Sequence, residues 1–178
     1  MDPQARFDAL YREHAGAVTR YVRRRSEPQS ADDVVADVFV VVWRRLDELP
    51  QDPLPWLLGV ARRVLANHRR GDARADALRR RIGSEQRTRA ATETGEEGGP
   101  TAVWAALDSL SERDREALLL VAWEGLSTAR AARVVGIGSN AFAARLYRAR
   151  RRFARALGTS TPKRPGPQRR STGTEALR

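Results

Sequence analysis

The strongest constraint on this fold is a pair of helical segments near the C-terminus that are separated by a turn of three residues. Ser127 is a typical N-cap for the helical pattern TARAARVV, and Ser139 is predicted to cap a longer helix that ends at Gly158. The turn between them reads Gly-Ile-Gly at 136–138. Two capped helices joined in this way are typical of a helix-turn-helix, the motif whose second helix reads duplex DNA.

Two shorter helices are predicted just before this motif. Apolar residues recur at helical spacing in the first of them: Val103, Ala106, Leu107 and Leu110. Ser111 is predicted to cap the second, which reads SERDREALLLVAWEG, with Asp114 in the capping-box position and Gly125 as its stop. Residues 103–157 are therefore predicted to form one small helical domain.

The last helix carries two kinds of side chain on different sides. One side is apolar and is predicted to pack on the preceding helix: Phe142, Leu146, Ala149, Phe153 and Leu157. The other is a row of arginines in a segment that contains no acid: Arg145, Arg148, Arg152 and Arg155. Such a row suits an outward surface that contacts phosphates, and a solvated arginine face is the alternative.

The start of this helix is predicted to read bases, because recognition helices contact base edges with their N-terminal residues. In this interpretation Ser139, Asn140 and Arg145 lie nearest the bases, since Asn pairs with adenine and Arg with guanine. Contacts to phosphate are assigned to Arg148, Arg151 and Arg152. Asn140 also fits a second interpretation, in which it caps the helix.

The N-terminal part of the chain predicts three more helices. The first has one apolar face and ends at the arginines 23–25, and its face is formed by Phe7, Leu10, Tyr11, His14, Val18, Tyr21 and Val22. The second is predicted to start near Ser30, its proposed cap, and to continue through VVADVFVVVWRRLDEL, where the valines leave a strand as the alternative. The third begins at about Pro55, after the loop LPQDPLP.

The second of these helices has more apolar surface than one core face requires. Most of its valines share one side, whereas Phe39, Val40 and Trp43 lie off that side. A helix that is apolar on more than one face is either buried in its own core or docks a partner. Simple core packing is therefore the alternative for Phe39 and Trp43.

Composition divides the chain into four parts. Residues 1–70 and 103–157 have the apolar periodicity of folded domains, whereas 71–102 has the composition of a flexible linker and contains almost no large apolar residues from Thr88 to Pro100. Residues 158–178 are rich in Pro, Gly, Ser and Thr and are predicted to be a disordered basic tail. The predicted fold class is all-α, with two small helical domains joined by a flexible linker.

The net charge of +11 indicates a polyanionic partner, either nucleic acid or an anionic membrane surface. Most of the excess lies in the C-terminal half, because residues 103–157 have 10 basic and 5 acidic residues and residues 158–178 have 5 and 1. No apolar run approaches the roughly 20 residues of a membrane span, and the N-terminus lacks the apolar core of a signal peptide. We therefore expect a cytoplasmic protein that binds nucleic acid.

Several kinds of chemistry are excluded by residue content. The chain has no Cys, and its two His lie far apart in sequence, so neither a metal cluster nor thiol catalysis is expected. No Ser/His/Asp set or phosphate-binding loop occurs, and the scattered acids fit helix caps. The sequence predicts that the protein is not an enzyme and has no metal or cofactor.

The two folded parts together resemble one protein family. The segment from ALDSLSERDREALLLVAWEG to NAFAARLYRARRRFARAL resembles region 4 of extracytoplasmic-function sigma factors, in the sigma-70 superfamily. The segments RFDALYREHAGAVTRYVRRR, DDVVADVFVVVWRRLDEL and PWLLGVARRVLANHRR resemble region 2 of the same family, in the family's order. The resemblance implies that the protein binds core RNA polymerase and promoter DNA, with an anti-sigma factor as a further possible partner.

The resemblance also implies where these partners bind. The second helix is expected to dock the clamp helices of the largest polymerase subunit through Asp33, Asp37, Phe39, Val40 and Arg44. The loop Leu46–Pro55 and the helix after it are expected to capture a flipped base and follow the opened minus-ten strand, using Trp56, Arg62, Arg63, Asn67, Arg69 and Arg70. For Trp56 a core role is the alternative. The helix-turn-helix is expected to hold the minus-35 element as duplex.

The chain departs from the family pattern at a few positions. Ala36 stands where the second helix usually has Gln, Arg63 where the third usually has Asn, and Arg130 where the helix before the turn usually has an acid. The recognition helix starts Asn-Ala-Phe-Ala-Ala at 140–144 in place of the typical Gly-Thr-Val-Lys-Ser. These positions remain compatible with helix, so the departures concern docking and DNA affinity rather than the fold.

Two other functions are open to a chain of this composition. One is a stand-alone helix-turn-helix regulator that binds duplex DNA without polymerase and uses its N-terminal half as a sensor or dimeriser. The other is a non-specific RNA- or nucleoid-binding protein whose basic tail supplies most of the affinity.

The linker acids Glu93, Glu96 and Glu97 suggest either a mimic of nucleic acid or an inert solvated spacer.

Overall fold

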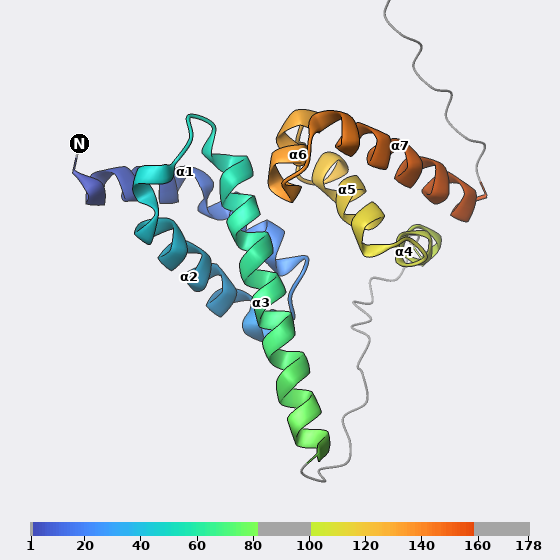
Figure 1. The fold of residues 1–178 in the computed structure, drawn as a ribbon, viewed down its shortest axis with the longest axis horizontal. Coiled ribbons are helices and arrows are strands. Elements are labelled where there is room, and N and C mark those ends of the chain that lie inside the picture. The colour runs from blue at the N-terminus through green and yellow to red at the C-terminus, as the bar shows by residue number, and fades with distance from the viewer. Residues whose placement is uncertain (1, 82–100, 159–178) are drawn as a thin grey trace, which may run out of the picture.

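The computed structural model describes residues 2–81 and 101–158, and within these ranges the chain forms seven α-helices, one short 3-10 helix and no strand (Figure 1). This confirms the all-α prediction. The predicted tail falls at 159–178, apart from Gly158, and much of the predicted linker falls at 82–100. Both segments lie outside the described residues.

Three helices build the N-terminal half: α1 (Pro3–Arg23), α2 (Pro28–Arg44) and α3 (Pro53–Arg81). The valine-rich segment is helical, as predicted, and buries Val34, Val38 and Val42 against the other two helices. Ser30 is not its cap, because the helix begins at Pro28 after Glu27, and the Ser30 hydroxyl instead donates to the Glu27 carbonyl at 3.2 Å. Proline suits the first position of a helix because its missing N–H has no partner there.

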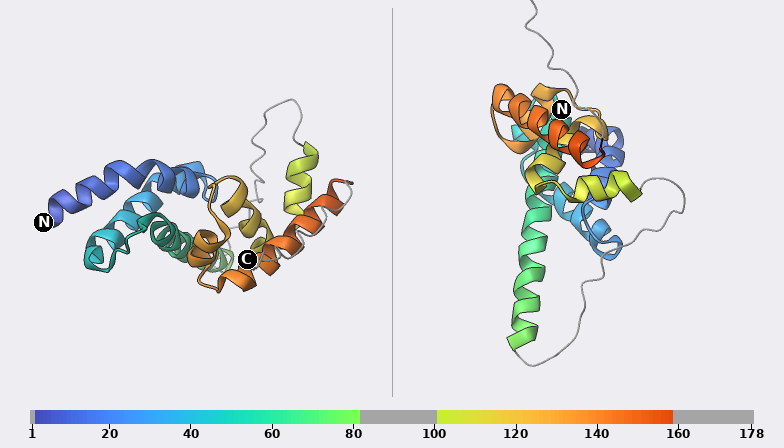
Figure 2. Two further views of the ribbon diagram at one scale, coloured as in Figure 1. Left: turned by 90° about the horizontal axis from the view of Figure 1, so that it is seen from above. Right: turned by 90° about the vertical axis from the view of Figure 1, so that its right-hand side faces the viewer.

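The connection from α2 to α3 is more ordered, and α3 is longer, than the sequence indicated. A 3-10 helix, η1 (Leu46–Glu48), occupies the start of the predicted loop, and α3 begins at Pro53. At its other end α3 continues beyond residue 70, where we expected the linker to begin, as far as Arg81. The placement of residues 71–81 in the linker is therefore wrong, and the end of α3 projects away from the rest of the molecule (Figures 1 and 2).

Four helices form the C-terminal half: α4 (Thr101–Asp108), α5 (Glu112–Ala122), α6 (Thr128–Val135) and α7 (Ser139–Ala156). Ser111 and Ser127 cap α5 and α6, as predicted, because their side chains accept from the backbone N–H three residues later. Gly136 has a φ of 73°, the left-handed conformation that ends α6. Ser139 does not cap α7: the cap residue is Gly138, and Ser139 is the first helical residue.

The two halves pack directly on each other through α3 and α6 (Figures 1 and 2). A Cβ placed on Gly59 of α3 would lie 3.5 Å from the Val134 carbonyl oxygen of α6, so the two helices approach closely at this point. Buried side chains from both halves form one continuous cluster. No helix within the described residues is both long and apolar enough to cross a membrane.

Candidate nucleic-acid interface

The recognition helix α7 presents its predicted core face inward and two arginines outward. Phe142, Leu146 and Ala149 are buried against the rest of the C-terminal half, as their spacing predicted. Arg148 is exposed and Arg145 is half-buried. Neither arginine has a hydrogen bond or ion pair with the residues that the structure describes. Their charge is therefore available to an external anion.

Two other arginines of α7 have contacts within the protein. Arg152 pairs with Asp114 of α5, whose side chain is only 7% exposed. Arg151 lies over the Tyr147 ring, with its guanidinium carbon 5.9 Å from the ring centroid, and its Nε is buried. The prediction of an arginine row with no acid beside it is therefore wrong at Arg152, because the acid comes from a different helix.

The first residues of α7 are open to solvent. Ser139 and Asn140 are both exposed, and α7 has no side-chain cap. Asn140 therefore does not cap α7, and that alternative interpretation is wrong. Both side chains project from the end of the helix that follows the turn, where a recognition helix meets base edges.

The predicted minus-ten arginines on α3 are partly engaged with acids of α5. The Arg62 guanidinium donates to both carboxylate oxygens of Glu116, at 2.7 and 3.2 Å, and this pairing raises the pKa of Arg62 above its ordinary value. Arg69 donates to Glu112 at 2.9 Å and to the Arg25 carbonyl at 2.9 Å. Arg63 is exposed.

The remaining predicted minus-ten residues lie along and beside the same helix. Asn67 and Arg70 are exposed neighbours, and Asn67 accepts a hydrogen bond from the Arg70 guanidinium. Trp56 is half-buried and packs against the core, and the Arg45 guanidinium lies 5.5 Å from its ring centroid. Trp56 thus has both a core contact and a partly exposed face.

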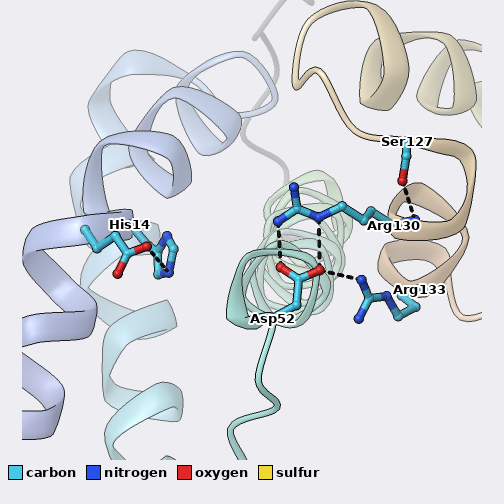
Figure 3. Close-up of polar contacts among 6 residues, drawn as sticks. His14, Asp52, Ser127, Arg130 and Arg133 are labelled. Carbon is cyan, nitrogen blue, oxygen red and sulfur yellow. Dashed lines mark hydrogen bonds and ion pairs between the residues drawn. The ribbon is translucent and has the colours of Figure 1, made fainter.

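The loop before α3 is held by the first helix of the helix-turn-helix. Arg130 of α6 donates to both oxygens of Asp52, at 2.6 and 3.0 Å, and Arg133 donates to the same carboxylate (Figure 3). The hydrogen bond from Arg130, aided by Arg133, lowers the pKa of Asp52 below its ordinary value. Arg130, at a position where the resemblance implies an acid, therefore faces an acid of the other half, where a carboxylate would be repelled.

The predicted polymerase-docking residues on α2 do not all lie at the surface. Asp33, Asp37, Val40 and Arg44 are exposed, and the Asp37 carboxylate lies 2.8 Å from His68 Nε2. Phe39 is buried, at 6% exposure, which agrees with the core alternative for this residue.

Trp43 is 45% exposed, and this contradicts the core alternative for that residue. An apolar groove runs between α1 and α2 beside it. Its lining residues are Gln4, Phe7, Ala36, Phe39, Val40 and Trp43. The α1 side of this groove was not among the predicted site residues. The aromatic residues Phe7 and Tyr11 of the first helix were the sequence feature that could have indicated an apolar surface there.

A buried acid links the two halves at the end of α1. Glu124, with a side chain only 7% exposed, accepts from Arg24 at 2.9 Å and from Arg25 at 3.0 Å. Arg25 also stacks on Tyr21, 3.7 Å from its ring centroid, and burial raises the pKa of Tyr21 to about 12. This cluster could not be predicted from the sequence, because Glu124 lies about a hundred residues from Arg24 and Arg25.

Comparison with known proteins identifies the family to which both halves are similar. Residues 10–75 match the family model described as Sigma-70 region 2, and residues 101–153 match the model described as Sigma-70, region 4. The chain is 28% identical over 170 residues to the RNA polymerase sigma factor NccH of Alcaligenes xylosoxydans xylosoxydans, an alignment that covers 88% of this chain and 89% of NccH.

Two solved structures have a similar fold. One is CnrH in complex with the cytosolic domain of CnrY, with 26% identity, a TM-score of 0.61 and coverage of 87% of this chain and 89% of CnrH. The other is the sigma factor RpoE of Bartonella quintana in complex with the anti-sigma factor NepR, with 22% identity, a TM-score of 0.64 and coverage of 85% and 96%. At 22% identity the second likeness concerns the fold alone.

Proposed function

This chain is an RNA polymerase sigma factor of the sigma-70 family, in its extracytoplasmic-function group, and we propose how its surfaces divide the work of promoter recognition. A sigma factor binds core RNA polymerase and directs it to promoters. It catalyses no covalent step itself. In our proposal α7 holds the minus-35 duplex, α3 and the loop before it hold the opened minus-ten strand, and α2 docks the polymerase clamp.

The observation that carries the proposal is the outer face of α7. Arg145 and Arg148 lie on a helix that follows a helix-turn-helix turn, and neither has an acid partner within the described part of the chain. Guanidinium groups in this position can bond guanine edges and phosphates in the major groove. Exposed Ser139 and Asn140 supply further donors and acceptors at the end of the helix that enters the groove.

Arg152 is reassigned in this proposal. Its ion pair with the buried Asp114 fixes α7 to α5, so we propose that Arg152 positions the recognition helix and that phosphate contacts fall mainly to Arg148 and Arg151.

The minus-ten proposal rests on the cations and the tryptophan of α3. Arg62, Arg63, Arg69 and Arg70 place positive charge along one helix, as needed to follow a phosphate backbone. Trp56 lies in the first turn of the same helix and has a partly exposed ring on which a base can stack. Strand capture on this surface offsets the free energy of melting, so no ATP is required for opening.

The docking proposal rests on the exposed side of α2. Val40 and Trp43 are each close to half exposed and border the apolar groove between α1 and α2. The exposed acids Asp33 and Asp37 and the base Arg44 flank this apolar surface. An apolar centre with a charged rim is the arrangement that a helix of a partner protein buries. Phe39 supports the groove from below rather than lying on the contact surface.

One further partner and the location follow by analogy. The similar protein CnrH was solved in complex with the cytosolic domain of CnrY. We propose that this chain likewise acts in the cytoplasm and is held by an anti-sigma protein when it is not bound to polymerase.

The test of this function is transcription reconstituted from core RNA polymerase, genomic DNA and the purified chain, followed by sequencing of RNA 5′ ends. Our proposal predicts starts at a defined set of promoters that vanish without the chain. A Val40→Asp variant should lose on the order of tenfold in core-polymerase affinity, because a charge would enter an apolar contact. The matched control is Ala9→Asp on the exposed side of α1, which should retain full affinity.

A different result favours the stand-alone regulator. If the chain binds specific duplex DNA with nanomolar affinity and shows no association with core polymerase, the α2 and α3 assignments are wrong. If Val40→Asp and Ala9→Asp behave alike, α2 is not the docking helix.

A further inference from the structure

An exposed line of residues runs along the side of α7 that points away from the core. The line consists of Asn140, Ala144 and Arg148, which are spaced four residues apart and therefore share one side of the helix. All three residues are exposed. α7 itself lies along the outside of the C-terminal half (Figures 1 and 2). This outer line of α7 is therefore open to a DNA duplex.

Ala144 occupies the centre of the outer line. At about 100° per residue, it lies roughly 140–160° around the helix from the buried side chains, which are Phe142, Leu146 and Ala149. Asn140 and Arg148 lie only about 40° to either side of Ala144. A duplex docked on this side of α7 therefore meets the methyl group of Ala144 between an amide and a guanidinium group.

The chemistry of this methyl group limits which base it can distinguish. It neither donates nor accepts a hydrogen bond. In the major groove every base pair presents hydrogen-bonding groups, and only thymine adds an apolar group, its C5 methyl. A methyl group placed against the polar edge of another base would bury that edge without a partner. The base feature that suits Ala144 is therefore the thymine methyl.

The short side chain also determines how closely α7 can approach the bases. The major groove is about 12 Å wide and a helix with its side chains is about 10–12 Å across, so the fit is tight. A long side chain at position 144 would hold the backbone away from the base edges. Asn140 and Arg148 each lie about 6 Å from Ala144 along the helix axis, and stacked base pairs are about 3.4 Å apart. The three residues therefore face neighbouring base pairs, about two steps apart.

We infer that Ala144 is a specificity-determining residue of α7, which selects a thymine in the minus-35 element by contact between its own methyl group and the thymine C5 methyl. The inference rests on the function proposed above for α7, and it names one base of the duplex that this helix binds. The exposed amide of Asn140 suits an adenine nearby. Arg148 has no acid partner in the described part of the chain and suits guanine or phosphate.

Replacement of thymine by deoxyuridine isolates this contact, because it removes the C5 methyl and leaves base pairing unchanged. The probe is a promoter mapped by sequencing of RNA 5′ ends, in which each thymine of either strand of the minus-35 element is replaced singly. The affinity of holoenzyme, formed from core polymerase and the full chain, is measured by competition with the unsubstituted duplex. One replacement should weaken binding about fourfold, the value of one buried methyl group.

Variants of the protein assign the lost contact to one residue. An exposed alanine also suits a helix through its propensity alone, so the variants must separate that role from DNA contact. In Ala144→Gly the same deoxyuridine should have no effect, because the protein methyl is already absent. Ala143→Gly is the matched control: Ala143 is exposed, lies about 100° around the helix from Ala144 and loses the same helix propensity, so the fourfold effect should remain.

A second variant guards against a loosened helix. Gln is a good helix former, and in Ala144→Gln its longer side chain displaces the methyl contact. This variant should also be insensitive to deoxyuridine.

Two results overturn the inference and leave the function of α7 in place. One is that no deoxyuridine weakens binding although scrambling the whole minus-35 element does. The other is a deoxyuridine effect of equal size in the unaltered chain, Ala144→Gly and Ala144→Gln, which assigns the thymine contact to another residue. If scrambling the element leaves holoenzyme affinity unchanged, α7 does not bind it, and the inference fails together with the function on which it rests.

Discussion

Two arginine-bearing helices, α3 and α7, differ in what surrounds their guanidinium groups. On α3, Arg62 and Arg69 are paired with Glu116 and Glu112 across the contact between the halves. On α7, Arg145 and Arg148 have no such partner within the described residues. The same type of side chain is therefore paired with an acid on α3 and without such a partner on the described part of α7. Net charge alone does not tell these two states apart, because it ignores which acids lie opposite.

The largest expected effect comes from the two arginines of α7 that have no acid partner within the described residues, Arg145 and Arg148. Arg145→Glu combined with Arg148→Glu should weaken binding to duplex DNA that carries the minus-35 element by on the order of 100-fold or more. Two favourable contacts are replaced by repulsion from the phosphates. Fluorescence anisotropy with a labelled promoter duplex measures the affinity, and the salt dependence of binding should become shallower in the variant.

Position on the helix provides the control for this prediction. Arg150 is exposed on α7 but lies on a different side from Arg145 and Arg148. Arg150→Glu should cost several-fold less affinity than Arg148→Glu. Equal losses from Arg148→Glu and Arg150→Glu would mean that α7 attracts DNA only through its general charge, and the contrast between the helices would then have no bearing on specificity.

Much of the local structure could be predicted from the sequence because its causes are local. The caps Ser111 and Ser127 and the left-handed Gly136 act within one helical turn, so the sequence alone places them. The predicted caps at Ser30 and Ser139 are wrong because neighbouring residues start these helices. Pro28 already starts α2, and Gly138 already occupies the cap position of α7. A serine near a helix start is a cap only when no neighbour has taken that place.

The sequence indicates which residue types the proposed site contains, and these assignments stay predictions, but it does not indicate which acids pair with its arginines. Arg62 and Glu116 are 54 residues apart, and Arg130 and Asp52 are 78 apart. Which acid meets which arginine depends on how α3 packs against α5 and α6, and periodicity along one helix carries no such information. For the same reason the spacing of apolar residues along α2 could not show that Phe39 is buried while Val40 and Trp43 are exposed.

A smaller effect is expected from the one arginine of the α7 row that does have an acid. Arg152→Ala should lower the free energy of unfolding by about 1–3 kcal/mol, because it leaves the buried Asp114 carboxylate without its partner. Thermal and urea unfolding measure the change. Arg148→Ala is the matched control and should leave stability nearly unchanged while it weakens DNA binding. The opposite pattern, with Arg152→Ala affecting only DNA affinity, would return Arg152 to the phosphate-binding set.

The smallest expected effect concerns the pH dependence of the contact between Asp52, in the loop before α3, and the arginines of α6. Arg130 and Arg133 face Asp52 and lower its pKa in the folded chain, so this contact stabilises the fold at pH values above the ordinary Asp pKa of about 4. The contribution is lost as the pH falls through the lowered pKa, because protonation removes the charge that the arginines hold.

The contribution of the Asp52 contact to the free energy of unfolding should be below about 1 kcal/mol, since Asp52 is partly exposed. The measurement is the difference in Tm between the unaltered chain and Asp52→Asn as a function of pH. This difference should be positive at neutral pH and shrink toward zero in acid, whereas Asp47→Asn, at an exposed acid of η1, should give little difference at any pH. A difference between the unaltered chain and Asp52→Asn that is independent of pH would show that the Asp52 side chain is held by its shape and packing rather than by the charges of Arg130 and Arg133.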